Sequence, residues 1–114
     1  MEAYRLMEKI TWVSHPIAEG VQIKPFISEK EHGLAVTCML VKIPAGKGVA
    51  EHIHPNQDDI LYPLAGRAAM WVDGAGKFSL EPGIVVRVPK GTKHKIFDVT
   101  EELSIYNVFS PALL

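Results

Sequence analysis

The sequence has 114 residues and a mass of 12.6 kDa, a length that corresponds to one domain. Hydrophobic residues make up 47% and charged residues 22% of the chain, a composition that is ordinary for a folded domain and excludes disorder of the whole chain. Lysine and arginine number 12 against 13 acidic residues, for a net charge of −1. We therefore expect no nucleic-acid binding, which usually needs a basic excess or a basic stripe.

The N-terminal stretch MEAYRLMEKI interrupts its apolar residues with charges, which is not typical of a signal peptide. No apolar run approaches the ~20 residues that a membrane-spanning helix needs. The single cysteine, Cys38, lies in the apolar run 34–41, so we expect it to be buried rather than reactive. These features predict a cytoplasmic protein with no membrane segment.

Short segments rich in apolar and β-branched residues follow one another along the chain, separated by turn signals rich in proline and glycine. These segments cover residues 21–27, 34–43, 60–64, 68–72, 84–88, 94–99 and 103–109. Asp73 and Gly74 lie between segment 68–72 and the stretch KFSL at 77–80, which indicates a β-hairpin. Since no helical segment of 10–15 residues separates the strands, we expect an all-β sandwich or small barrel. Pro63 predicts an edge strand or a bulge at its position.

Three histidines carry the strongest indication of chemistry. His52 and His54 are two residues apart, so on a strand their imidazoles point to the same face. Two neutral imidazoles on one face are the start of a transition-metal site. Asp58 and Asp59 follow closely and could add an oxygen ligand, while His94 begins a distant strand just after a tight turn.

The spacing around these histidines forms two blocks, residues 46–66 and 83–98. The first block reads Gly46-x5-His52-x-His54-x4-Asp59-x6-Gly66. The second reads Gly83-x5-Pro89-x-Gly91-x2-His94-x3-Asp98. In order and spacing they resemble the two motifs of the cupin family, in which a glutamate usually stands at the position of Asp59 and an asparagine at that of Asp98.

This resemblance implies an all-β fold, a cupin-type jelly-roll β-barrel, that forms a single domain over residues 1–114. It implies one divalent transition metal (iron, manganese, nickel or zinc), held by His52, His54, Asp59 and His94. It also implies a small-molecule ligand or substrate and a homodimer. Because aspartate is one methylene shorter than glutamate, a site of three histidines without a carboxylate is an alternative. Asp58 is an alternative ligand if the spacing after His54 is three residues rather than four.

Two functional classes fit this resemblance. The first is a metal-dependent enzyme of dioxygenase, decarboxylase or isomerase type that acts on a small organic molecule. The second is a non-catalytic module that binds or senses a small molecule and uses its metal structurally. A degenerate barrel without metal is disfavoured because all three histidines are present. The family pattern also turns Ala68, Met70, Val72 and Ile96 inward, as an apolar wall that suits a partly apolar ligand.

Other side chains receive structural interpretations. His15 and His32 lie in stretches typical of loops, and we expect both to be solvated. Tyr62 is expected to pack in the core. Candidates for a general acid or base outside the ligands are Asp98, Glu51 and Tyr106, of which Tyr106 is also expected to pack in the core. None of them is assigned a catalytic role, since a base must lie within hydrogen-bond reach of the proton that it removes.

Overall fold

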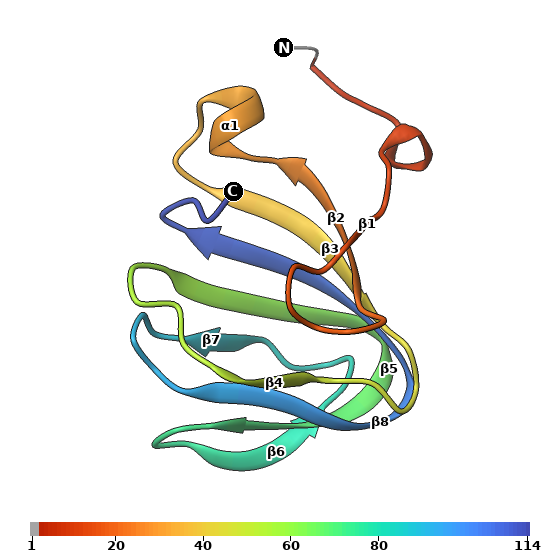
Figure 1. Cartoon of the computed structure of the whole chain (residues 1–114), viewed down its shortest axis with the longest axis vertical. Helices are drawn as coiled ribbons and strands as arrows, with labels where there is room; N and C mark the ends of the chain where they lie inside the picture. The colour runs from red at the N-terminus through yellow and green to blue at the C-terminus, as the bar shows by residue number, and fades with distance from the viewer. Residues whose placement is uncertain (1–2) are drawn as a thin grey trace.

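The computed structural model describes residues 3–114, and strands dominate them (Figure 1). The strands are β1 (Val13–Ser14), β2 (Gln22–Ile27), β3 (Thr37–Ile43), β4 (Val49–His52), β5 (Asp58–Val72), β6 (Gly76–Leu80), β7 (Val86–Val88) and β8 (His94–Ser110). The helical elements are single turns, η1 (Met7–Lys9) and α1 (Glu29–His32). No helix within residues 3–114 has the length and apolar character needed to cross a membrane. The dominance of strands confirms the expected all-β fold.

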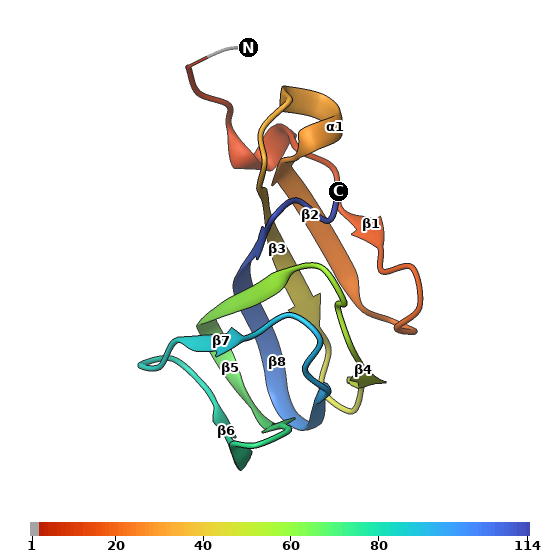
Figure 2. The same ribbon diagram turned by 90° about the vertical axis from the view of Figure 1, so that its left-hand side faces the viewer.

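Two long strands, β5 and β8, organise the sheet because each takes part in two layers. One layer has the order β1-β2-β3-β8-β5-β7 and uses residues 103–110 of β8 and 58–65 of β5. In the other, β4 and β6 flank residues 94–101 of β8 and 67–72 of β5. Figure 2 shows β5 and β8 running together through the lower half of the molecule. The two layers enclose a lumen, as the cupin-type barrel requires.

The bend in β5 connects the two layers. The pairing register between β5 and β8 shifts repeatedly between Pro63 and Ala69, which confirms the bulge that Pro63 predicts. Gly66 lies at the centre of this stretch with φ of +91°, and a Cβ atom there would overlap the carbonyl oxygen of Glu102. Segments 60–64 and 68–72, expected as separate strands, are therefore one bent strand, and the same is true of segments 94–99 and 103–109 in β8.

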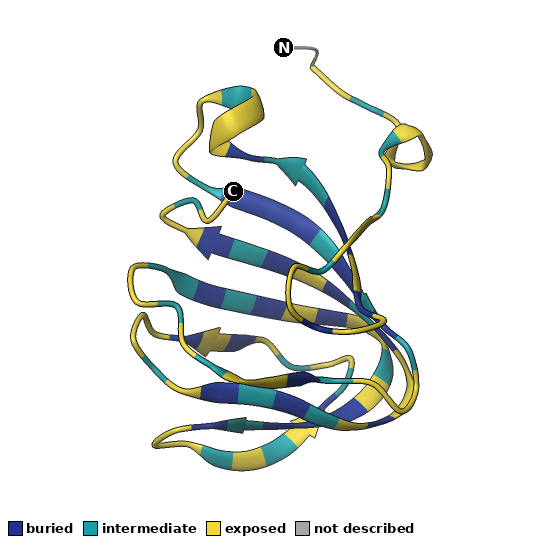
Figure 3. Ribbon diagram, in the orientation of Figure 1, coloured by how far each residue is buried: buried dark blue, intermediate teal, exposed yellow. Residues whose placement is uncertain are grey.

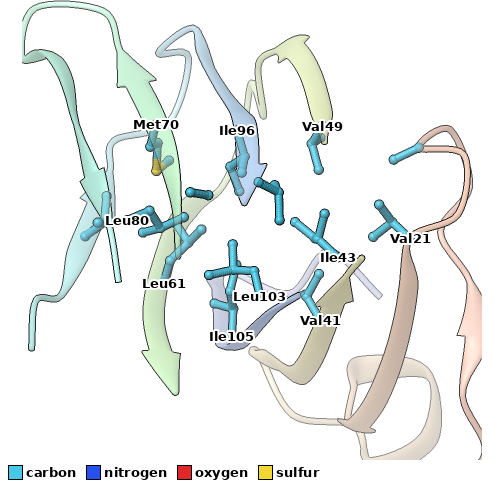
Figure 4. Close-up of a cluster of buried hydrophobic side chains, with 14 of the residues drawn as sticks. Val21, Val41, Ile43, Val49, Leu61, Met70, Leu80, Ile96, Leu103 and Ile105 are labelled. Atoms are coloured by element: carbon cyan, nitrogen blue, oxygen red, sulfur yellow. The ribbon is translucent and has the colours of Figure 1, made fainter. Parts of the chain in front are cut away.

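The core lies between the layers, and along much of β8 buried residues alternate with more exposed ones (Figure 3). Along the second half of β8, inward residues are Leu103, Ile105, Asn107 and Phe109, all buried. Figure 4 shows apolar side chains from both layers converging in the interior. Each such side chain contributes about 1.5–3 kcal/mol when it leaves water. The burial that the sequence predicts for Cys38 is also confirmed.

Two sequence expectations about side-chain burial are wrong. Tyr62 and Tyr106 lie opposite each other on the outer face of β5 and β8, 51% and 38% exposed. The alternation that directs Asn107 inward turns Tyr106 outward. The His32 side chain is buried. Its Nδ1 accepts a hydrogen bond at 3.1 Å from the backbone N–H of Ser28, the residue that precedes α1.

Candidate metal centre

The pairing of β4 with β8 brings the three histidines together. His52, the last residue of β4, is the direct partner of His94, the first residue of β8. His54 follows two residues after His52, and its ring centroid lies 4.9 Å from that of His52 and 5.5 Å from that of His94. One ring nitrogen from each histidine lies within 4.8 Å of the others. The three residues thus form a cluster that could hold a metal ion.

Backbone carbonyl groups orient two of these imidazoles. Nδ1 of His52 lies 2.7 Å from the carbonyl oxygen of Ala50, and Nδ1 of His94 lies 2.9 Å from that of Thr92. A neutral histidine that donates its Nδ1–H to a carbonyl keeps the lone pair on Nε2. This is the arrangement in which metal-binding histidines are usually found.

The Nε2 atom of His94 provides the test of whether this cluster fits a metal. This atom is fully buried and makes no hydrogen bond with any described residue. A buried polar atom without a partner costs about 1–3 kcal/mol, so natural proteins seldom leave one without a reason. A metal ion bound by three imidazoles would use this lone pair, and nitrogen donors of this kind suit iron, nickel and zinc. The donor set therefore fits the metal that the fold family implies.

Asp59 adds a buried carboxylate to the cluster. Its Oδ2 lies 3.3 Å from Nε2 of His94 and 3.7 Å from Nε2 of His54. Its Oδ1 accepts a 2.6 Å hydrogen bond from Nδ2 of Asn107, which also donates to the carbonyl of Ile60 at 2.8 Å. Asn107 therefore fixes the carboxylate with one oxygen directed at the histidines.

Asp58, the alternative ligand, is engaged elsewhere. Its Oδ2 accepts hydrogen bonds from Arg87 and its Oδ1 accepts one from the backbone N–H of Lys90, each at 2.9–3.0 Å. The Lys90 N–H and the Arg87 guanidinium lower the pKa of Asp58. The two carboxylate oxygens of Asp58 thus hold β5 to β7 and to the loop that follows β7.

The cluster histidines respond to burial in different ways. Burial lowers the pKa of His52 and His54, since it disfavours the charged imidazolium. Burial acts in the same direction on His94, but the Asp59 carboxylate and the Thr92 carbonyl outweigh it, and the pKa of His94 is raised. The cluster thus keeps His52 and His54 neutral, while His94 holds a proton more firmly in the absence of metal.

The cluster opens into a cavity of about 200 Å³ inside the barrel. Its walls are mostly aliphatic, and Val41, Leu61 and Ile105 are among them. Two segments close its mouth: residues 15–17, and residues 113–114, which the buried hydroxyl of Thr37 holds by accepting their backbone N–H groups at 3.0 and 2.8 Å. A larger, more open hollow of about 590 Å³ between η1 and Glu31 contains none of the cluster residues.

Sequence reasoning missed two residues of this cavity. His15, expected to be solvated, is half-buried and lines the cavity near His52. Nothing in its local sequence indicates this, because the loop reaches the mouth only after folding. Asn107 could have been found, since it is a polar residue at an inward position between Ile105 and Phe109.

Other expectations about the cavity also need correction. Of the apolar wall that the resemblance implies, only Ile96 reaches the cavity, whereas Ala68, Met70 and Val72 are buried in the core beyond it. The acid or base candidates Asp98, Glu51 and Tyr106 are all exposed and absent from the lining. The polar side chains that line the cavity are therefore the histidine cluster, Asp59, Asn107 and His15.

Fold and cluster together define the class of protein as a small β-barrel with a histidine cluster that could hold a metal ion, and comparison with known proteins gives the family. Residues 39–109 match the model of the cupin domain family. The match covers more than half of the chain, and this protein is a member of the cupin family. An uncharacterized protein of Streptomyces coelicolor, SCO3923, is 36% identical over 72 residues, which are 63% of this chain and 67% of that protein.

Solved structures share the fold at lower sequence identity. A predicted oxalate decarboxylase from Thermotoga maritima superposes with a TM-score of 0.80 at 20% identity, covering 93% of this chain and 96% of the other. The polyketide cyclase RemF from Streptomyces resistomycificus gives a TM-score of 0.80 at 16% identity, covering 97% and 80%. At these identities the likeness establishes the fold alone.

Proposed function

We propose that this cupin is a metal-dependent enzyme that acts on a small organic molecule inside the barrel. The observation that carries the proposal is the convergence of His52, His54 and His94 at the end of a mostly apolar cavity, where the buried Nε2 of His94 makes no hydrogen bond with a described residue and faces the Asp59 carboxylate at 3.3 Å. A structural metal site is usually closed by protein ligands, whereas a catalytic site keeps an open position toward its substrate. Here the cavity adjoins the histidine cluster.

In this proposal His52, His54 and His94 hold one divalent transition metal, and Asp59 supplies the fourth donor. Two donor atoms that are each about 2.1 Å from one ion lie roughly 3.0–3.4 Å apart in tetrahedral or octahedral geometry. The 3.3 Å separation of Asp59 Oδ2 from Nε2 of His94 is compatible with this range. Asp58 is disfavoured because Arg87 and Lys90 occupy both of its oxygens.

The residues of this chain would contribute to the reaction by orienting the metal ligands and by excluding water from the substrate. A bound divalent ion supplies a Lewis acid for an oxygen of the substrate. The aliphatic walls keep water out and strengthen every electrostatic interaction inside. Asn107 keeps Asp59 aligned through the 2.6 Å hydrogen bond. Decarboxylation and cyclisation, which the names of the two structural neighbours describe, are reactions that such a site supports.

A binding or sensing module is the second candidate. It is favoured by the small number of polar groups on the cavity, where His15 and Asn107 are the described polar residues besides the cluster and Asp59. The two functions differ in turnover. If the metal-loaded protein binds a ligand tightly, with no change in the ligand or in dissolved oxygen under multiple-turnover conditions, the sensing function is favoured over the enzyme.

Elemental analysis of purified protein and of three variants tests the metal centre. We expect one divalent ion per chain in the parent, little metal in His94→Ala, and a marked loss of affinity in Asp59→Ala. Asp58→Ala is the matched control, since it removes a neighbouring carboxylate, and it should retain the metal. If Asp59→Ala binds metal as the parent does, the centre has three histidine ligands and the carboxylate assignment is wrong.

We also propose that two copies pair through the outer face of β3, β8 and β5. Leu40, Tyr106 and Tyr62 form one cross-strand row there, and Tyr62 and Leu64 are about half exposed. Contiguous apolar surface of this kind typically marks an interface. Tyr62→Glu should convert a dimer into a monomer in light scattering, whereas a 12.6 kDa particle for the parent would contradict the dimer.

The cytoplasmic location stays a prediction.

A further inference from the structure

The cavity lacks the groups that a highly charged substrate needs. No lysine or arginine is found among its lining residues within the described chain. A dianion such as oxalate would carry one negative charge more than a divalent ion and the Asp59 carboxylate together could balance. Burying a charge without a paired partner is costly. The walls instead offer aliphatic side chains such as Met39, Val41 and Leu61.

The polar groups of the cavity form one connected set. The three histidines lie together, Asp59 lies against His54 and His94, and Asn107 binds Asp59. His15 is also close enough for its charge to affect His52. A molecule that fills this space therefore meets polar partners at one end and apolar walls along the rest of its length.

The volume limits the size of the apolar part. An apolar cavity of roughly 150 Å³ is known to accommodate a benzene molecule. The cavity here measures about 200 Å³, which leaves room for a body of that size and a small polar head. A polycyclic body or a long chain would extend beyond this volume toward solvent.

We infer that the site selects a compact, neutral or singly charged molecule that carries one metal-binding polar head on an apolar body of about six carbons. The inference rests on the proposed metal centre and names its substrate class. The polar head faces the histidine cluster, and the apolar body lies against the aliphatic walls. Polyhydroxylated and multiply charged molecules are rejected because their polar groups find no partners there.

Alkyl hydroxamates of increasing chain length test this inference, because each offers one metal-binding head and carries at most one negative charge when it binds a metal. The protein is loaded with Co²⁺, and binding is measured by calorimetry and by the visible spectrum of the cobalt. Burial contributes about 0.8 kcal/mol per methylene, which corresponds to roughly fourfold in affinity. Hexanohydroxamate should therefore bind up to about 200-fold more tightly than acetohydroxamate, and oxalate should bind no better than acetohydroxamate.

Paired lysine variants provide the matched control. Ile17 lies at the cavity mouth and is 76% exposed, whereas Val85 is 66% exposed and outside the lining. Ile17→Lys should tighten oxalate binding severalfold, since it places a cation at the mouth. Val85→Lys should leave it unchanged. Equal effects of the two variants would mean that oxalate senses only the net charge of the protein, which contradicts selection by the cavity.

The outcomes separate this inference from the proposed function. If Co²⁺ fails to bind, the metal centre and the substrate class are both overturned. If Co²⁺ binds but affinity is independent of chain length, or if oxalate binds more tightly than hexanohydroxamate, the metal centre stands and the substrate class is wrong. A rise in affinity that stops near six carbons supports both the class and the cavity size.

Discussion

His15 uses a single ring nitrogen to hold the loop at the cavity mouth. Its Nδ1 accepts hydrogen bonds from the backbone N–H groups of Ile17 at 3.2 Å and Ala18 at 3.0 Å. A nitrogen that accepts carries no proton, so the neutral ring bears its hydrogen on Nε2. Partial burial, and then the nearby His52, lower the pKa of His15. The folded loop therefore requires the neutral form of this residue.

The mouth loop should loosen as the pH falls. Because the folded-state pKa of His15 is lowered, its contribution to stability is present above the unfolded-state pKa and is lost as the pH falls through the folded-state pKa. Hydrogen exchange at the amides of Ile17 and Ala18 should accelerate below about pH 6, relative to intrinsic rates. In His15→Asn this additional acceleration should be absent. Amides that stay equally protected in the parent at low pH would contradict the role of His15.

Asn107 should matter for metal affinity although it is not a proposed ligand. Asn107→Ala removes the donor to Asp59 Oδ1 and lets the carboxylate rotate away from His94. The loss of a group that orients a metal ligand typically costs about 10–100-fold in affinity, and we expect a loss in that range by metal titration. Ser104→Ala, on the outward side of the same strand, is the control and should bind metal normally. Unchanged affinity in Asn107→Ala would show that Asp59 holds its position alone.

The sequence predicts some residues of this site and not others. The separation of His52 and His54 by two residues is a local property of a strand, and the motif spacing points to His94 as their partner. The orientation of Asp59 depends on Asn107, which lies 48 positions away in the sequence. No local sequence pattern predicts a contact over that distance. The position of His15 depends on a loop that packs only after the barrel has formed.

At the scale of elements, the bend in β5 depends on one residue. Gly66 combines a positive φ with a close approach to the backbone of Glu102. Gly66→Ala should lower the free energy of unfolding by at least about 2 kcal/mol, because it adds left-handed strain to an overlap with backbone atoms. Chemical denaturation measures the change. Gly74→Ala, also at positive φ but with open space around it, is the control and should cost less.

Strand positions could be predicted better than strand lengths. Turn signals and apolar segments located most elements within a few residues, and the Asp73-Gly74 turn lies between β5 and β6. The sequence does not indicate that β5 and β8 continue through their bulges, since Pro63 and the exposed stretch 100–102 interrupt the apolar pattern there. A strand can pass through such a stretch when its neighbour supplies the pairing, as Ile105 does for Pro63.

At the scale of the whole molecule, the barrel depends on the last strand of the sequence. β8 pairs with β3, β4 and β5, so it belongs to both layers and supplies His94. A chain that ends at residue 93 should therefore have no cooperative unfolding transition and should aggregate through its unpaired strand edges. Circular dichroism and light scattering measure this. Deletion of residues 3–10, which lie outside the strands, is the control and should leave a folded barrel.

The position of β8 has a consequence for the order of events during protein synthesis. A ribosome makes roughly 5–20 residues per second, so β3 and β5 leave the exit tunnel seconds before β8 does. During that interval their edges and apolar faces lack the strand that pairs with them. The barrel therefore cannot close before β8 has emerged, and non-local pairing of this kind is slow, with folding times of milliseconds to seconds.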